Sequence, residues 1–180
     1  MHNRRIVTGH SASGKSVFVS DAPAPRTGTF KSIPGFVASL VWETPRDATV
    51  PWSGGDPTID SKSIVPPLGG TNLQLVTFPP DSVMMSEQFD PAAAGLESMQ
   101  LLPGLAEKFE MDSPGMHTTD SVDYDILIEG EMHLELDDGA IVRLVPGDMV
   151  VQNGTRHAWR NKSDKPATLL FVLVGAKRKS

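Results

Sequence analysis

The part of this sequence that follows Met116 constrains the fold most strongly, because short segments of alternating apolar and polar residues follow one another there with only turns between them. These segments are DYDILIEG, EMHLELDDG, AIVRLVPGD, MVVQNG, HAWRN and TLLFVLVGA. Alternation with a period of two, interrupted by Asp-Gly and Pro-Gly-Asp turns, is typical of antiparallel strands that bury one face. The sequence therefore predicts an all-β domain with a dense antiparallel sheet in this region.

Residues 114–161 contain three of the five histidines and most of the side chains that can carry chemistry. Two motifs stand out in this stretch, and their members are His117, Thr119, Asp123 and Gly130, followed by Gly147, His157 and Asn161. The pair resembles the double motif of the cupin superfamily, whose first motif has two histidines and a glutamate before a glycine. Here Thr119 stands where the family has its second histidine, and Asp123 stands where it has the glutamate.

The resemblance implies an antiparallel double-stranded β-helix, the jelly-roll barrel of cupins, with N-terminal extra strands and a short helical insert. It also implies that His117, Asp123 and His157 meet at the barrel mouth as catalytic residues and metal ligands. Two imidazoles and one carboxylate suit iron(II), zinc, manganese or nickel. Because the chain has no cysteine, any metal must be held by nitrogen and oxygen ligands. A metal-free version of the site would use a histidine as general acid and base.

The segment DYDILI places Asp123, Asp125 and Leu127 on one face of a strand, and Tyr124, Ile126 and Ile128 on the other. We expect Asp125 and Thr119 to contact the substrate, together with Trp159, which shares the parity of His157 and forms either an aromatic wall or part of the core. The apolar opposite face needs cover from the N-terminal strands or from a second subunit, and the cupin resemblance favours a homodimer.

The whole chain, residues 1–180, is expected to form a single cupin domain. Residues 1–80 supply N-terminal strands and an arm, with strands at 5–10, 15–21, 36–44 and 72–78. Residues 22–35 are predicted to be a loop, and 45–70 an irregular arm over the barrel or over a neighbouring protomer. Residues 81–113 form a partly helical insert that begins with Asp90 as N-cap and Pro91 at the first helical position. This insert either packs against the barrel or acts as a lid, and residues 114–175 carry the barrel motifs.

Residues 9–16, GHSASGKS, match the pattern of a phosphate-binding loop. Such a loop needs a helix after it, whereas VFVSDAPAPRTG follows, with β-branched residues and two prolines. We therefore interpret this match as a Gly/Ser turn between two strands.

Composition excludes several classes of partner. A net charge of −6 argues against nucleic acid or an anionic membrane as the main partner. The start of the chain lacks the apolar segment of a signal peptide, and the longest apolar run, LLFVLV, is far too short to span a bilayer. A cytoplasmic protein that binds a small molecule is the expectation.

The leading functional hypothesis is a metal-dependent cupin enzyme that acts on a modest organic compound, aromatic or polyketide-derived. Oxygenase and non-redox lyase, dehydratase or cyclase chemistry are both compatible with the residues. The alternative is a metal-free cupin module that binds a small ligand. An isomerase of nucleotide-sugar type is a third possibility, but few arginines are placed to hold its phosphates.

Overall fold

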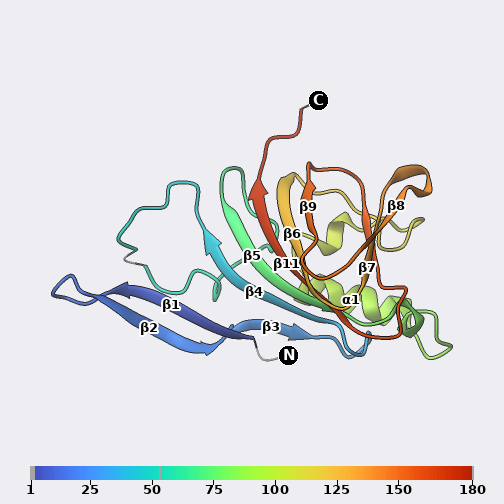
Figure 1. Cartoon of the computed structure of the whole chain (residues 1–180), viewed down its shortest axis with the longest axis horizontal. Coiled ribbons are helices and arrows are strands. Elements are labelled where there is room, and N and C mark those ends of the chain that lie inside the picture. The colour runs from blue at the N-terminus through green and yellow to red at the C-terminus, as the bar shows by residue number, and fades with distance from the viewer. Residues whose placement is uncertain (1–2, 53, 180) are drawn as a thin grey trace.

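A six-stranded antiparallel sheet is the main layer of the protein in the computed structural model, which describes residues 3–52 and 54–179 (Figure 1). Its strands, in spatial order, are β3 (Arg26–Thr29), β4 (Val37–Thr44), β5 (Thr71–Phe78), β11 (Ala167–Gly175), β6 (Ser121–Glu129) and β9 (Met149–Gln152). A second, three-stranded sheet consists of β10 (Ala158–Arg160), β7 (Met132–Glu135) and β8 (Ile141–Leu144). The predicted all-β antiparallel class is confirmed.

The core lies between the inner faces of these two sheets and the insert. Leu127 and Leu169 come from the large sheet and Met132 from the small one, and each is at most 1% exposed. Phe171 and Leu134 belong to the same cluster. Inward and outward residues alternate along each strand. The inner face of β6 therefore carries Leu127 together with buried polar and acidic residues, which form the candidate site described below.

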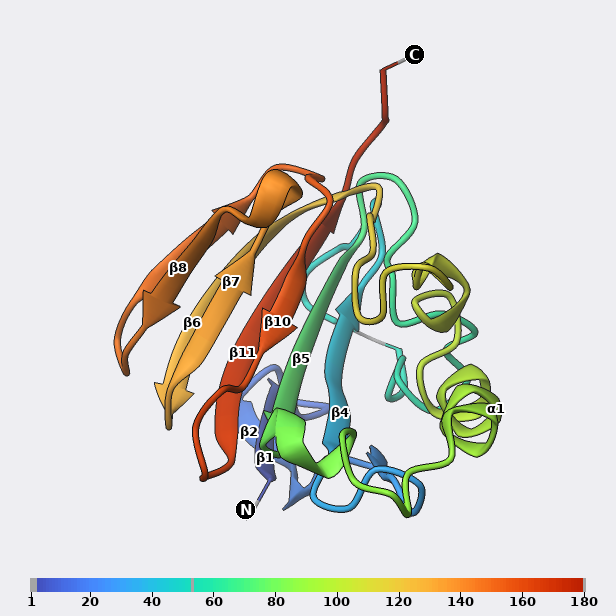
Figure 2. The same cartoon turned by 90° about the vertical axis from the view of Figure 1, so that its right-hand side faces the viewer.

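The insert between β5 and β6 packs against the core with its short helix α1 (Pro91–Leu101), which Figure 2 shows facing the sheets. As predicted, Asp90 caps this helix, and its carboxylate accepts hydrogen bonds from the N–H groups of Ala92 and Ala93. Ala94 and Leu102 are buried in the core cluster. The 3₁₀ turns η1 (Asp81–Val83) and η2 (Ala106–Lys108) flank the helix.

The N-terminal hairpin consists of β1 (Arg4–His10) and β2 (Ser16–Pro23), and it projects from the sheets (Figure 1). The predicted Gly/Ser turn is confirmed, since Ser11 N–H donates to the carbonyl of Lys15 and Gly14 adopts a φ of +77°. The GHSASGKS segment therefore closes a hairpin, and a strand rather than a helix follows it.

The prediction that residues 22–35 form only a loop is wrong, because β3 lies within them and pairs with β4. Prolines flanking a strand are tolerated when the strand is at the edge of a sheet, as β3 is. Residues 45–70 contain no helix or strand among the described residues, as predicted. Ile64 enters the core there, and its carbonyl accepts hydrogen bonds from Asn72 and Gln74.

Within the residues that the structure describes, no helix has the length and apolar character needed to cross a membrane.

Candidate functional site

Five alternate residues leading into and along β6 point their side chains into the barrel. All are at most 7% exposed, and they are His117, Thr119, Ser121, Asp123 and Asp125. The intervening Tyr124 and Ile128 are about half exposed on the outer face. This confirms the parity expected from the sequence. The hydroxyl of Ser121 donates to the hydroxyl oxygen of Thr119 over 2.9 Å, which holds the two side chains together.

His117 and His157 form a close pair although 40 positions separate them in the sequence. Their backbones pair as an isolated antiparallel bridge with two N–H···O bonds of 3.0 Å, and their ring centroids lie 4.3 Å apart. The Nδ1 atom of His117 is 3.1 Å from the carbonyl oxygen of Gly115, and that of His157 is 2.9 Å from the carbonyl oxygen of Thr155. A carbonyl only accepts, so each Nδ1 carries the hydrogen and each Nε2 presents an unprotonated lone pair.

Burial keeps both imidazoles neutral. It lowers the pKa of His117, and burial together with the neighbouring His117 lowers the pKa of His157 to about 4. A charged imidazole would lose its hydration here with little to replace it. At neutral pH both rings are therefore able to accept a proton.

Aromatic side chains surround the histidine pair. Phe109, from the insert, meets the ring of His117 edge-on with centroids 5.0 Å apart. Trp159 lies 5.9 Å from His157 and 5.5 Å from Phe171, so it belongs both to the site and to the core. The sequence left these two roles of Trp159 open, and the structure assigns it both.

The two inward carboxyl groups lie in an environment that favours their protonated forms. Burial raises the pKa of Asp123 to about 6, and burial together with the charge of Asp123 raises the pKa of Asp125 to about 8. Both oxygens of Asp125 and one oxygen of Asp123 have no hydrogen-bond partner among the described residues. Strongly shifted, unpartnered carboxyl groups in an enclosed setting are typical of functional sites.

Gln152 is a site residue that the sequence reasoning missed. It pairs directly with Asp123 across β6 and β9 and is 4% exposed, and its Nε2 has no hydrogen-bond partner within the described part of the chain. Its Oε1 accepts a hydrogen bond from the hydroxyl of Thr155, next to the loop that carries His157. Met149 and Val151 are exposed on the other face of β9, so the apolar residues of MVVQ gave no signal that Gln152 points inward. Nothing in the sequence around Phe109 indicated its contact with His117.

A salt bridge fixes the end of the insert beside the histidines. Arg156 makes two hydrogen bonds to the carboxylate of Glu110, of 2.8 and 2.6 Å, and a third to Asp137. Because Glu110 follows Phe109 and Arg156 precedes His157, this contact sets the spacing between the insert and the histidine loop.

The residues do not fit the three-ligand metal site that the cupin resemblance implies. Throughout residues 3–52 and 54–179, no three His, Asp or Glu side chains are grouped closely enough to share one ion. His117 and His157 are neighbours, but Asp123 does not join them as a third ligand. The candidate site is therefore a pair of neutral imidazoles with a buried carboxyl pair on the same inward face.

The comparisons with known proteins agree with this architecture. The model of the Cupin domain family matches residues 110–173, which include the histidine pair and both aspartates. Solved structures give only a distant likeness, such as a Cupin 2 conserved barrel domain protein from Salinispora arenicola at 18% identity and a TM-score of 0.41, covering 78% of this chain and 76% of that one.

The curated relatives include proteins named for biosynthesis clusters and proteins named as cupin-domain-containing oxidoreductases. Phomopsin biosynthesis cluster protein C' of Diaporthe leptostromiformis is 31% identical over 96% of this chain and 78% of its own length. The Cupin-domain-containing oxidoreductase virC of Hypocrea virens is 28% identical over 96% of this chain and 76% of its own length. With two characteristic motifs on the strands of an antiparallel fold, and with a relative of this identity along most of both chains, this protein belongs to the cupin family.

Proposed function

We propose that this protein is an enzyme of fungal natural-product biosynthesis in which His117 and His157 transfer protons to and from a small aromatic or polyketide-derived substrate. The observation that carries this proposal is that both Nδ1 atoms face backbone carbonyls, which places the hydrogen on Nδ1 and leaves both Nε2 atoms unprotonated. The aromatic rings of Phe109 and Trp159 support a planar, largely apolar substrate.

In this mechanism one imidazole acts as the general base. Its Nε2 accepts a proton from the substrate, and the second imidazole, 4.3 Å away between centroids, is placed to exchange protons with the same substrate region. Asp125, whose pKa is raised to about 8, is protonated at neutral pH and can donate a hydrogen bond to a substrate oxygen. Burial excludes water from these transfers and strengthens each electrostatic contact.

Proton transfer of this kind serves either reaction class that the sequence left open. A lyase, dehydratase or cyclase needs it as the main chemical step. An oxygenase needs it beside an electron transfer, and two of the relatives are named oxidoreductases. Metal dependence is a second proposal, because an unprotonated Nε2 is also the form of histidine that binds a metal ion.

The test of proton transfer is hydrogen–deuterium exchange at acidic C–H groups, measured by proton NMR in D₂O with a panel of aryl ketones and short polyketide lactones. Wild-type protein is expected to accelerate exchange in at least one compound, and His117→Gln and His157→Gln are expected to lose about 100-fold or more of that rate. His10→Gln, in the exposed hairpin, is the matched control and keeps the full rate. Equal rates in wild type and both site variants would refute the assignment.

Metal content decides the second proposal. Purified protein is offered iron(II) or zinc, dialysed, and analysed by mass spectrometry for bound metal. Stoichiometric metal that disappears in both His117→Ala and His157→Ala would establish a metal site at the histidine pair. Protein that retains no metal after loading, yet catalyses exchange, would establish the metal-free mechanism.

A further inference from the structure

Three neighbouring side chains on the inner face of the six-stranded sheet carry buried polar atoms without hydrogen bonds. They are Asp123, Asp125 and Gln152, which are 5, 2 and 4% exposed and are called the polar trio below. Within residues 3–52 and 54–179, one oxygen of Asp123, both oxygens of Asp125 and the Nε2 of Gln152 have no partner. Buried polar atoms are nearly always hydrogen-bonded, so four such atoms in one place indicate that they pair with a group from outside the chain.

The strands beside the trio offer it apolar neighbours. On the β11 side, Asp125 lies directly opposite Phe171 and Asp123 lies opposite Leu173. Both of these neighbours belong to the buried core cluster. On the β9 side, Asp125 lies opposite Val150. An unpaired donor or acceptor is costly in surroundings of this kind, which makes the trio a place where a polar ligand group would be bound strongly.

Gln152 adds a hydrogen-bond donor to the carboxyl groups. It is directly paired with Asp123, and the Cβ atoms of such a pair lie about 4.5–5.5 Å apart. The hydroxyl of Thr155 donates to the Oε1 of Gln152 over 2.6 Å, and this contact fixes which end of the amide is free. The free Nε2 forms no hydrogen bond to the carboxyl group opposite it. The trio therefore presents one N–H donor and three carboxyl oxygens to the same neighbouring group.

We propose that the polar trio binds an amide group of the substrate, such as a lactam or a secondary carboxamide. The Nε2 of Gln152 donates to the amide carbonyl, and a carboxyl oxygen of Asp123 or Asp125 accepts the amide N–H. This inference rests on the proton-transfer function proposed above, and it narrows the substrate to an aromatic compound that carries an amide.

An amide is the group whose hydrogen-bonding capacity matches the trio. A ketone or a lactone has a carbonyl for the glutamine N–H but no N–H for the carboxyl oxygens. An amine has N–H groups for the carboxyl oxygens but no acceptor for the glutamine. A buried site that is built to hydrogen-bond its ligand rejects analogues that leave its polar groups unpaired. The trio is therefore expected to discriminate against these other classes.

Short contacts connect the trio to the histidine pair. Thr155 holds the glutamine of the trio through its hydroxyl, and its carbonyl accepts the Nδ1 hydrogen of His157 over 2.9 Å. Phe171, which lies beside the trio, is 5.5 Å from Trp159 between ring centroids, and Trp159 is 5.9 Å from His157. An aromatic ring attached to the bound amide would therefore extend along Trp159 towards the histidines.

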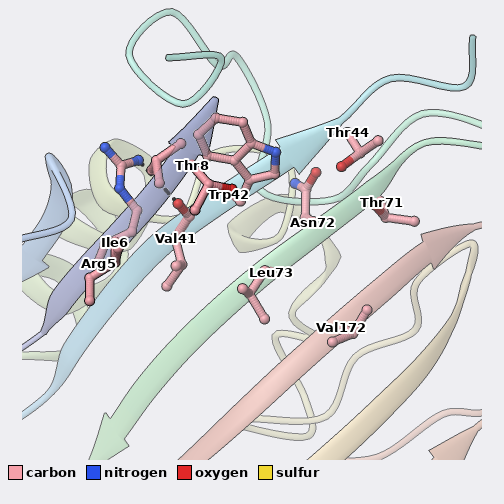
Figure 3. A pocket seen from close by; sticks show the side chains of 11 residues that line it. Arg5, Ile6, Thr8, Val41, Trp42, Thr44, Thr71, Asn72, Leu73 and Val172 are labelled. Atoms are coloured by element: carbon pink, nitrogen blue, oxygen red, sulfur yellow. Dashed lines mark hydrogen bonds between the residues drawn. The ribbon is translucent and has the colours of Figure 1, made fainter. Parts of the chain in front are cut away.

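Figure 3 shows the opposite face of the same sheet, where Leu73 and Val172 border a groove of about 540 Å³. Val172 stands between Phe171 and Leu173 in the sequence, and alternation along β11 therefore separates the groove from the trio. The groove also contains Trp42 and is an alternative place for a flat aromatic compound. Substitutions in the trio distinguish the two locations, because they leave the groove unchanged.

The test compares 2-quinolinone with coumarin, which has the same fused rings and carbonyl but an oxygen in place of the amide N–H. Each compound is titrated into the whole chain, and its dissociation constant is measured by NMR. Wild type is expected to bind 2-quinolinone about 10-fold or more tightly than coumarin. A double variant, Asp123→Leu with Asp125→Leu, is expected to lose this preference, because it has no acceptor for the N–H.

Gln152→Met tests the donor of the trio. It is expected to weaken both compounds about 10-fold, because the glutamine N–H serves the carbonyl that they share. Gln100→Met, at an exposed position of α1, is the matched control and keeps the wild-type affinities. Circular dichroism melting verifies that each variant is folded, and the comparison of the two compounds on wild type decides the matter where a variant is not.

Equal affinity of wild type for the two compounds overturns the inference, and so does a wild type that binds neither of them at about 5 mM. Unchanged binding in a folded Gln152→Met variant overturns it as well, since the compounds then bind elsewhere, as in the groove of Figure 3. The deuterium-exchange assay judges the proposed function separately. A preference for 2-quinolinone without any exchange supports amide binding and refutes proton transfer, whereas exchange without this preference does the reverse.

Discussion

Replacing Asp125 by asparagine isolates the energetic cost of a buried carboxyl group. The side chain is 2% exposed, neither oxygen has a partner among the described residues, and its pKa is raised to about 8 by burial and by Asp123. An acid whose pKa is higher in the folded protein than in the unfolded chain favours folding while it is protonated. That contribution is lost as pH rises from the unfolded pKa towards the folded one.

The magnitude follows from linkage. With a folded pKa of about 8 and an ordinary value of 3.8 in the unfolded chain, the stability of the wild type falls by about 1.6 kcal/mol between pH 6.5 and pH 8 because of this one group. The two buried histidines oppose this decline by at most about 0.4 kcal/mol each, since an unfolded histidine titrates near 6.5 and the folded ones titrate lower. Asp123, with a pKa of about 6, has completed most of its titration.

Urea unfolding at pH 6.5, 7, 7.5 and 8 measures the effect. Asp125→Asn is expected to remove about 1.6 kcal/mol of the decline, and so to be more stable relative to wild type at pH 8 than at pH 6.5. Asp164→Asn, at an exposed position, is the matched control and keeps the wild-type slope. If wild-type stability is flat across this range, or if Asp125→Asn declines as steeply as wild type, the carboxyl group is not held in its protonated form.

Three further changes probe other parts of the structure by the same unfolding assay. His157 has a folded pKa of about 4, below the ordinary histidine value of 6.5, so wild-type stability should rise by about 3 kcal/mol from pH 4 to 6.5 through this residue. His157→Gln should remove that rise. Met132→Ala, at a fully buried position, should cost about 2–5 kcal/mol, whereas Leu96→Ala, 70% exposed, should cost under about 1 kcal/mol. Gly130→Ala should destabilise more than Gly139→Ala, because both glycines have positive φ but only at Gly130 would a Cβ lie 2.5 Å from a backbone oxygen.

Each of these predictions has an outcome that contradicts it. A His157→Gln variant with the wild-type acid profile would mean that the imidazole is accessible to water. If Met132→Ala and Leu96→Ala lowered the free energy of unfolding equally, the placement of the core between the sheets would be contradicted. If Gly130→Ala and Gly139→Ala lowered the free energy of unfolding equally, the positive φ alone would make glycine necessary at position 130. The close approach of another loop would then have no effect.

Strand alternation made much of the site predictable. The pattern around Asp123 and Asp125 placed both carboxyl groups inward because side chains on a strand alternate strictly between its faces. The same rule could not identify Gln152, because the wholly apolar face of MVVQ, Met149 and Val151, is the exposed one. It could not give the approach of Phe109 to His117, because that contact depends on how an irregular insert returns to the barrel, and no periodic pattern governs such a path.

Predictions from local sequence also failed for segments whose structure depends on partners that are distant along the chain. The strand Arg26–Thr29 lies among prolines and glycine, and it forms because β4 offers a free edge to pair with. In the insert, Met85 and Met111 are 83% and 97% exposed although methionine is an apolar residue that is often buried. Their exposure depends on the orientation of the insert, which the sequence does not encode locally.

The sequence by itself determined the cupin barrel, the inward face of β6 and the turn between β1 and β2, because period-two alternation and turn residues act over a few positions. Only the tertiary structure decided how the two motif histidines relate to the carboxyl groups. The 4.3 Å approach of His117 and His157, and the failure of Asp123 to join them as a third ligand, arise from the pairing of strands that are far apart along the chain. Distances between such strands depend on the packing of the whole core.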